Sequence, residues 1–141
     1  IFQFAFDGTQ STHLPHYYDI NCVAYTGTHD NDTLLGWLYK ANEGARNFAL
    51  KYCNFQGFGW GAGGPECGST KAIIKTVIAS SASLAVIPIQ DLLGYGSDTR
   101  MNVPGVAEGN WEFRIANEAL YGLDRAYFAD INNTYGRSCG M

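Results

Sequence analysis

The sequence contains little charge and no cluster of basic residues. Only 16% of its 141 residues are charged, and 9 Lys and Arg stand against 13 Asp and Glu, which gives a net charge of −4. Nucleic-acid-binding domains usually carry a basic patch, so we do not expect nucleic acid as a partner. The longest apolar run is far shorter than the ~20 residues that cross a bilayer. A membrane partner is therefore not expected either.

Clustered metal ligands and nucleotide-binding motifs are also lacking. The four cysteines are scattered, with no CxxC pair and no Cys/His cluster, whereas zinc sites usually show closely spaced ligand pairs. So few cysteines in a chain of this length favour free thiols and a reducing compartment over a disulfide framework, and we expect a cytoplasmic protein. No GxxxxGKS/T motif is present, so nothing supports a nucleotide site.

What the sequence does contain is a strand–turn–helix transition crowded with polar groups. Apolar residues make up 46% of the chain, which is typical of a globular domain. Residues 22–26 are a short apolar run of β-formers, which predicts a buried strand. Four polar residues, 29–32 (HDND), follow within a few positions, and a helical pattern begins at once over residues 33–42. In a β/α architecture such a turn is where binding and catalytic side chains are placed.

The polar turn has a plainer interpretation as well. Asn31 and Asp32 precede a predicted helix, and a role as its cap explains both residue types. Capping explains His29 and Asp30 less well. On position and chemistry alone, these two residues are equally consistent with a functional site and with a structural role.

Two further apolar runs end in the same way. Residues 2–6 precede Asp7, and residues 84–89 lead to Asp91. A long connection without a helical pattern separates the first two runs, and predicted helices separate the second from the third. Three parallel strands joined by right-handed crossovers are therefore predicted, with their acids at one edge. Residues 33–42 and 43–53 are expected to form two helices, or one helix bent near Gly44. Further helices are expected at residues 70–82, capped by Ser69, and in a terminal segment containing residues 120–131, whereas residues 54–68 and 94–111 are expected loops.

Three ordered motifs resemble one enzyme family. Residues 25–33 (YTGTHDNDT) are similar to the signature of 4-alpha-glucanotransferases, also called amylomaltases or disproportionating enzymes, of the alpha-amylase clan. Two other stretches resemble the same family. Upstream these are FAFD at 4–7 with LPH at 14–16, and downstream QDLLG at 90–94, RMNVPG at 100–105 and GNW at 109–111. The motifs fall in the family's order, and the similarity runs nearly end to end.

The resemblance implies a fold and a reaction. It implies an α/β fold that forms about the last three β/α units of a TIM (β/α)8 barrel, with residues 1–141 as a C-terminal fragment of the catalytic barrel and no second domain. A complete barrel typically needs ~250 residues, so we expect that the earlier part of the barrel, before the first strand, is missing from this sequence. The implied reaction is retaining transfer of alpha-1,4-glucan segments between maltooligosaccharides or starch- and glycogen-derived glucans. Its nucleophile and acid/base, about 5–5.5 Å apart, are expected upstream of Ile1, and no metal or organic cofactor is implied.

The resemblance also assigns roles to residues. Asp30 matches the family's third carboxylate, which stabilises the oxocarbenium-like transition state, and His29 matches a partner that contacts sugar hydroxyls. Asp7 matches a sugar-contacting carboxylate, although Asp7 and the residues after it are equally consistent with a simple turn. For the loop at 94–111 the residues themselves favour a structural role, in which Arg100 holds the loop in shape by bonding to a buried carboxylate or to carbonyls. The alternative is direct contact with bound sugar, for which Asn102 is the best candidate.

Two other functions remain open at this point. A non-catalytic carbohydrate-binding module would use exposed aromatic residues as stacking platforms, but such modules are usually antiparallel β-sandwiches and the helical spacing of residues 70–82 argues against one. A glucan hydrolase of the same clan would share Asp30. The candidate platforms are Tyr17, Tyr18, Trp60 and Trp111, whereas Trp37 falls within a predicted helix and is expected in the core.

Overall fold

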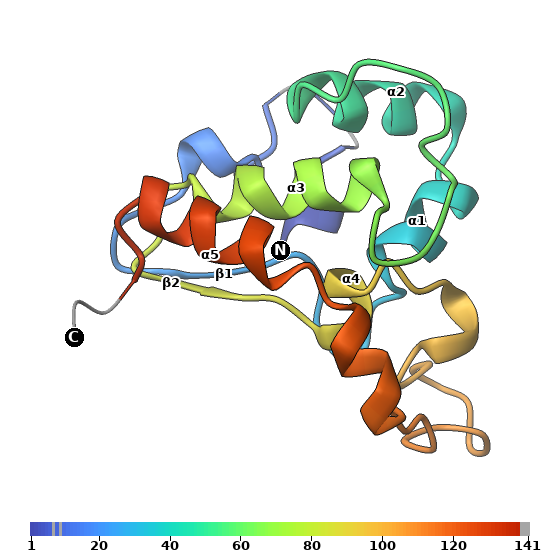
Figure 1. Cartoon of the computed structure of the whole chain (residues 1–141). Coiled ribbons are helices and arrows are strands. Elements are labelled where there is room, and N and C mark those ends of the chain that lie inside the picture. Colours follow the sequence, from blue (N-terminus) through green and yellow to red (C-terminus); the bar gives the residue numbers. More distant parts are fainter. Residues whose placement is uncertain (7, 9, 139–141) are drawn as a thin grey trace.

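Five helices and two short strands make up a mixed α/β structure (Figure 1). The computed structural model describes residues 1–6, 8 and 10–138. Asp7 therefore lies outside the described residues. The strands are β1 (Val23–Tyr25) and β2 (Leu84–Val86), and the helices are α1 (Leu34–Lys40), α2 (Glu43–Tyr52), α3 (Gly68–Ile78), α4 (Ile89–Leu92) and α5 (Arg125–Thr134). Short 3-10 turns cover Phe2–Ala5, Pro15–Tyr17, Ser97–Thr99 and Asn117–Gly122.

The two strands are parallel neighbours, as predicted for the second and third apolar runs. Val23 pairs with Leu84, and Tyr25 pairs with Val86. Ala24 is buried, whereas Val23, Leu84 and Val86 are 45%, 53% and 38% exposed. The pair is therefore covered on one face only, whereas buried strands were expected. β2 is shorter than the predicted 84–89 because Pro88, which cannot donate a ladder hydrogen bond, directly precedes α4.

The first apolar run does not form a strand, so that prediction is wrong. Phe2–Ala5 is a 3-10 helix, in which the Phe4 amide donates to the Ile1 carbonyl at 3.2 Å. Phe2 and Phe6 are buried with ring centroids 4.7 Å apart, whereas Phe4 is half exposed. A strand would direct all three phenylalanines to one face. The helical turn instead places Phe2 and Phe6 on one side, where both pack on the Trp37 ring, and leaves Phe4 on the other.

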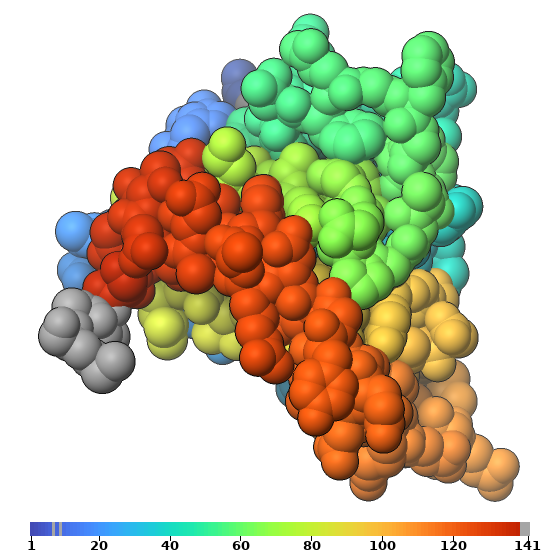
Figure 2. All heavy atoms as spheres, in the orientation of Figure 1, coloured from blue at the N-terminus to red at the C-terminus, as the bar shows by residue number. Residues whose placement is uncertain are grey.

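Helix α3 lies at the centre of the molecule. It contacts α1, α2, α4 and α5, and Figure 2 shows α5 lying along it. Its buried face consists of Ile73, Ile74, Val77 and Ile78, the apolar spacing predicted from the sequence. Ser69 is not its cap, because the helix begins at Gly68. The Ser69 hydroxyl instead donates to the Trp60 carbonyl at 2.5 Å and holds the end of the preceding loop.

The terminal helix begins later than predicted. A 3-10 turn covers Asn117–Gly122, and the Asp124 carboxylate then caps α5 by accepting from the Tyr127 amide at 3.1 Å. After α5, the Arg137 guanidinium donates to the carbonyls of Ile78, Ser80 and Ala82, which fastens the end of the described chain to the α3–β2 connection. Over residues 1–6, 8 and 10–138, no helix has the length and apolar character needed to cross a bilayer.

Candidate functional site

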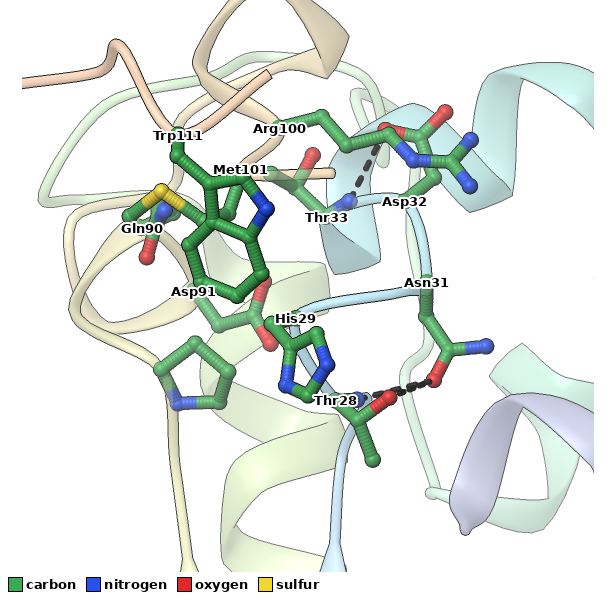
Figure 3. A pocket seen from close by; sticks show the side chains of 11 residues that line it. Thr28, His29, Asn31, Asp32, Thr33, Gln90, Asp91, Arg100, Met101 and Trp111 are labelled. Carbon is green, nitrogen blue, oxygen red and sulfur yellow. Dashed lines mark hydrogen bonds between the residues drawn. The ribbon is translucent and has the colours of Figure 1, made fainter. Parts of the chain in front are cut away.

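A cavity of about 180 Å³ opens where the chain leaves β1 and β2 (Figure 3). Three segments line it, all beyond the carboxyl ends of the parallel strands, which is where open α/β sheets place their ligands. The turn after β1 contributes Thr28, His29, Asn31, Asp32 and Thr33, the segment after β2 contributes Pro88, Gln90 and Asp91, and the later loop contributes Arg100, Met101 and Trp111.

Asp91 joins the elements beneath this cavity. Its side chain is almost completely buried and accepts from the Thr26 hydroxyl at 2.7 Å and from the Leu34 amide at 2.8 Å. Burial raises the pKa of Asp91 to about 6, opposed by these two hydrogen bonds and reinforced by the nearby charge of Asp32. Asp91 thus ties the end of β1 and the start of α1 to α4.

The residues predicted as caps of α1 do not cap it. Thr33 is the cap, and its hydroxyl accepts from the Gly36 amide at 3.1 Å, because the helix begins one residue later than expected. Asp32 accepts from Lys40 at 2.6 Å and from Ser97 at 2.8 Å. Asn31 accepts from the amide and hydroxyl of Thr28 and so shapes the turn itself.

At the rim of the cavity, His29, which lines it, comes together with Asp30 and Asn102, which do not line it. His29 Nε2 lies 3.3 Å from Asp30 Oδ1, and the two side chains are 57% and 49% exposed. The Asn102 amide donates to the same Asp30 oxygen at 2.7 Å, across 72 positions of sequence. The structure therefore gathers three of the four predicted site residues, and the fourth, Asp7, lies outside the described residues.

Arg100 fastens the loop to the turn. Its guanidinium donates to the carbonyls of Asp30 at 2.6 Å and Asn102 at 2.8 Å. The backbone N–H of Asn102 donates in turn to the His29 carbonyl at 3.1 Å. The prediction that Arg100 shapes the loop by bonding to carbonyls is confirmed, and the loop is bound to the backbone on both sides of the Asp30 side chain.

Trp111 lines the cavity. The family motifs alone did not predict this position. Sequence reasoning named it only as a platform of a binding module. Its ring centroid lies 5.0 Å from that of His29, and its φ of 63° is left-handed. The one sequence feature that points to it is its position directly after Gly109-Asn110 in a family motif.

The chemistry of the rim suits a neutral, hydroxyl-rich ligand. A carboxylate, an imidazole and an amide offer both acceptors and donors, and an aromatic face lies beside them. In the described ranges 1–6, 8 and 10–138, no three His, Cys, Asp or Glu side chains are grouped so that they could hold a metal ion.

The family profile of the 4-alpha-glucanotransferases matches residues 1–119. The chain belongs to the 4-alpha-glucanotransferase family. It is 42% identical over 119 residues to the 4-alpha-glucanotransferase of Thermus thermophilus, which covers 82% of this chain and 23% of that protein. It is 38% identical over 142 residues to the chloroplastic/amyloplastic 4-alpha-glucanotransferase of Solanum tuberosum, covering 97% and 23%, and 38% identical over 143 residues to that of Synechocystis sp., covering 97% and 26%.

A solved amylomaltase has the same fold over nearly the whole chain. The amylomaltase of Streptococcus agalactiae, in complex with acarbose, superposes with a TM-score of 0.86 at 31% identity. The match covers 99% of this chain and 27% of that one. This member of the 4-alpha-glucanotransferase family thus spans about a quarter of the length of the relatives it matches.

Proposed function

We propose that this chain is part of a retaining 4-alpha-glucanotransferase that moves alpha-1,4-glucan segments between maltooligosaccharides or starch- and glycogen-derived glucans. The observation that carries the proposal is the Asp30 carboxylate, paired with His29 and held by Asn102 at the rim of the cavity beyond β1. The relatives named as 4-alpha-glucanotransferases and the neighbour bound to acarbose support it.

In this proposal residues 1–141 come from about the last three β/α units of a (β/α)8 barrel, although the first of the three expected strands is a 3-10 turn. The parallel pairing of β1 and β2 and the cavity beyond their carboxyl ends support it, since barrel enzymes build their sites there. The nucleophile and the acid/base would lie on strands outside this chain. A cytoplasmic location stays a prediction.

Asp30 is the transition-state carboxylate of this reaction. Breaking a glycosidic bond places positive charge on the sugar ring, and a fixed carboxylate stabilises that charge most where it is fully developed. Asn102 holds Asp30 in place through one N–H and has a second N–H and an oxygen for sugar hydroxyls. His29 offers a further ring nitrogen for hydroxyls, and Asp7 remains a predicted sugar contact. In the first step the nucleophile outside this chain would bond to the anomeric carbon while the acid/base protonates the departing sugar oxygen. An acceptor sugar hydroxyl, deprotonated by the same acid/base, would then attack that carbon and release the nucleophile.

Replacing Asp30 with Asn in the full-length enzyme tests this role. The amide keeps the shape and much of the hydrogen bonding, so KM should change little. Loss of the charge should lower kcat about a hundred- to a thousandfold. Asp130→Asn, at an exposed position of α5, is the matched control and should leave both constants unchanged. A folded Asp30→Asn enzyme with nearly normal kcat would remove Asp30 from the catalytic residues.

Product analysis with maltotriose separates transfer from hydrolysis. Longer maltooligosaccharides are expected, and glucose and maltose alone would instead identify a hydrolase of the same clan. The binding-module alternative is not retained, because such modules are antiparallel sandwiches and the two strands here are parallel and connected through helices.

A further inference from the structure

Trp111 has a backbone conformation that a bulky residue rarely adopts. Its φ is 63°, in the left-handed region, which costs a non-glycine residue free energy and persists only where the surroundings impose it. The Trp111 amide donates to the Met101 carbonyl at 2.7 Å. This bond joins residue 111 to residue 101 across the second half of the loop.

The Asn110 side chain holds the same loop from within. Its oxygen accepts from the Val103 amide at 2.9 Å, and its nitrogen donates to the Val106 carbonyl at 2.7 Å. Gly105 and Gly109 supply the turns, both at positive φ. Figure 2 shows this part of the chain projecting from the body of the molecule. These hydrogen bonds hold the loop in a conformation that keeps Trp111 at its left-handed φ.

The indole is aimed at the cavity and is not packed into the core. The indole lies beside the His29 ring: the two ring centroids are 5.0 Å apart, and the ring planes make an angle of 42° (Figure 3). Trp111 is 53% exposed. Trp37 differs, since its ring packs on Phe2 and Phe6. A half-exposed aromatic face beside the His29 ring, which itself lies 3.3 Å from Asp30, suits a pyranose, whose C–H face packs on the ring while its hydroxyls reach polar groups.

We propose that Trp111 is the platform on which one glucosyl residue of a bound alpha-1,4-glucan stacks, next to the sugar that Asp30 contacts. The inference rests on the proposed function and gives Trp111 a role in substrate binding by the transferase, whereas the sequence named it only as a platform of a binding module. The strain at Trp111 is retained because it places the indole at the rim of the cavity. A relaxed backbone would turn the ring elsewhere.

Maltoheptaose binding to the full-length enzyme tests the platform. Calorimetric titration uses the Asp30→Asn background, in which the sugar binds without rapid turnover. Adding Trp111→Gly should weaken binding about tenfold, which corresponds to 1.4 kcal/mol. Trp111→Phe keeps a ring and should stay within about threefold of the parent. Tyr121→Ala removes an aromatic ring that is 82% exposed and does not line the cavity, and it should bind like the parent.

Thermal unfolding of the same variants separates stacking from a structural role. Glycine accepts a positive φ without strain, so Trp111→Gly should melt at or above the temperature of its parent. Equal binding by Trp111→Gly and the parent would overturn the platform and leave the proposed function standing. A lower melting temperature accompanying the loss of affinity, or an equal loss in Trp111→Phe, would also overturn it. If the parent neither binds maltoheptaose nor, with Asp30 restored, lengthens maltotriose, the proposed function fails, and the platform fails with it.

Discussion

A single buried carboxylate connects three segments around the candidate site. Asp91 accepts hydrogen bonds from Thr26, just after β1, and from Leu34, the first residue of α1. An acceptor removed from this position would leave the Leu34 amide without a partner in a buried environment, which costs about 1–3 kcal/mol. The acid that the sequence placed at a strand edge therefore holds these segments together. Asp30, the carboxylate proposed to act on the sugar, is half exposed instead.

The raised pKa of Asp91 predicts a pH dependence of stability. The pKa is 3.8 for an ordinary aspartate and about 6 here, so the folded protein holds the proton more tightly than the unfolded chain. Between about pH 4 and pH 6 the folded state carries more protons, and this contribution to the free energy of unfolding falls as the pH rises. One pKa unit is worth 1.36 kcal/mol, so the fall is on the order of 3 kcal/mol.

Asp91→Asn should abolish that contribution. The amide oxygen still accepts from Leu34, and the amide nitrogen can donate to the Thr26 hydroxyl. The melting temperature of the variant relative to the unchanged protein should therefore rise from pH 4 to pH 6.5. Asp130→Asn, an exposed aspartate in α5, should show no such trend. A constant difference between Asp91→Asn and the unchanged protein across this range would contradict the prediction.

The site residues were accessible to sequence reasoning to different degrees. His29 and Asp30 follow an apolar run at once, and that local pattern together with the family motif singled them out. Asn102 lies 72 positions from Asp30, so its contact with the carboxylate depends on the tertiary fold, and only the motif pointed to it. Trp111 was missed as a cavity residue because no propensity of tryptophan predicts a left-handed φ.

At the scale of elements, the end of α4 depends on one glycine. Gly94 has φ +63°, its amide donates to the Asp91 carbonyl, and the Tyr95 amide donates to the Gln90 carbonyl. This pair of bonds is the Schellman arrangement that ends helices. A Cβ at Gly94 would also collide with the Gly64 carbonyl oxygen. The helix end and the glycine-rich loop at residues 54–68 therefore meet with no room for a side chain.

Gly94→Ala should lower the free energy of unfolding by roughly 2–4 kcal/mol, from the left-handed φ and the backbone collision together. Gly44→Ala is the matched substitution. In α2 an added Cβ meets only the Asn42 side chain, at an ordinary 3.4 Å, and a helical alanine is favoured over glycine by roughly 0.5–1 kcal/mol. The two melting temperatures should shift in opposite directions. A Gly94→Ala protein as stable as the parent would contradict this description of the junction.

Local patterns predicted the helices better than the strands and caps. The apolar spacing in α2 and α3 is one-sided and long enough to identify them. The run at residues 2–6 is ambiguous by its nature, since five residues rich in Phe satisfy a strand pattern and a helical turn alike. Packing on the Trp37 ring decides for the turn. Asp32 was misassigned as a cap because Thr33 is an equally good cap one residue later.

At the scale of the whole molecule, one face of the strand pair lacks a cover. Val23, Leu84 and Val86 are exposed there, and unpaired strand edges associate readily. Residues 1–141 expressed alone should therefore self-associate in size-exclusion chromatography and show no maltotriose disproportionation. Leu84→Thr with Val86→Thr should reduce the association, and supplying the remaining barrel segments should relieve it as well. A stable monomer that lengthens maltotriose by itself would contradict both the barrel proposal and the assignment of roles within it.

The hydrogen bond between Asp30 and Asn102 can form only some time after Asp30 has been synthesised. Because 72 residues separate the two partners, and a ribosome adds roughly 5–20 residues per second, Asn102 is made roughly 4–14 s after Asp30. During that interval the turn that carries His29 and Asp30 exists without Arg100, Asn102 and the loop that ends at Trp111. The rim of the cavity is consequently among the last parts of this chain to take shape, after β2 has been made and can pair with β1.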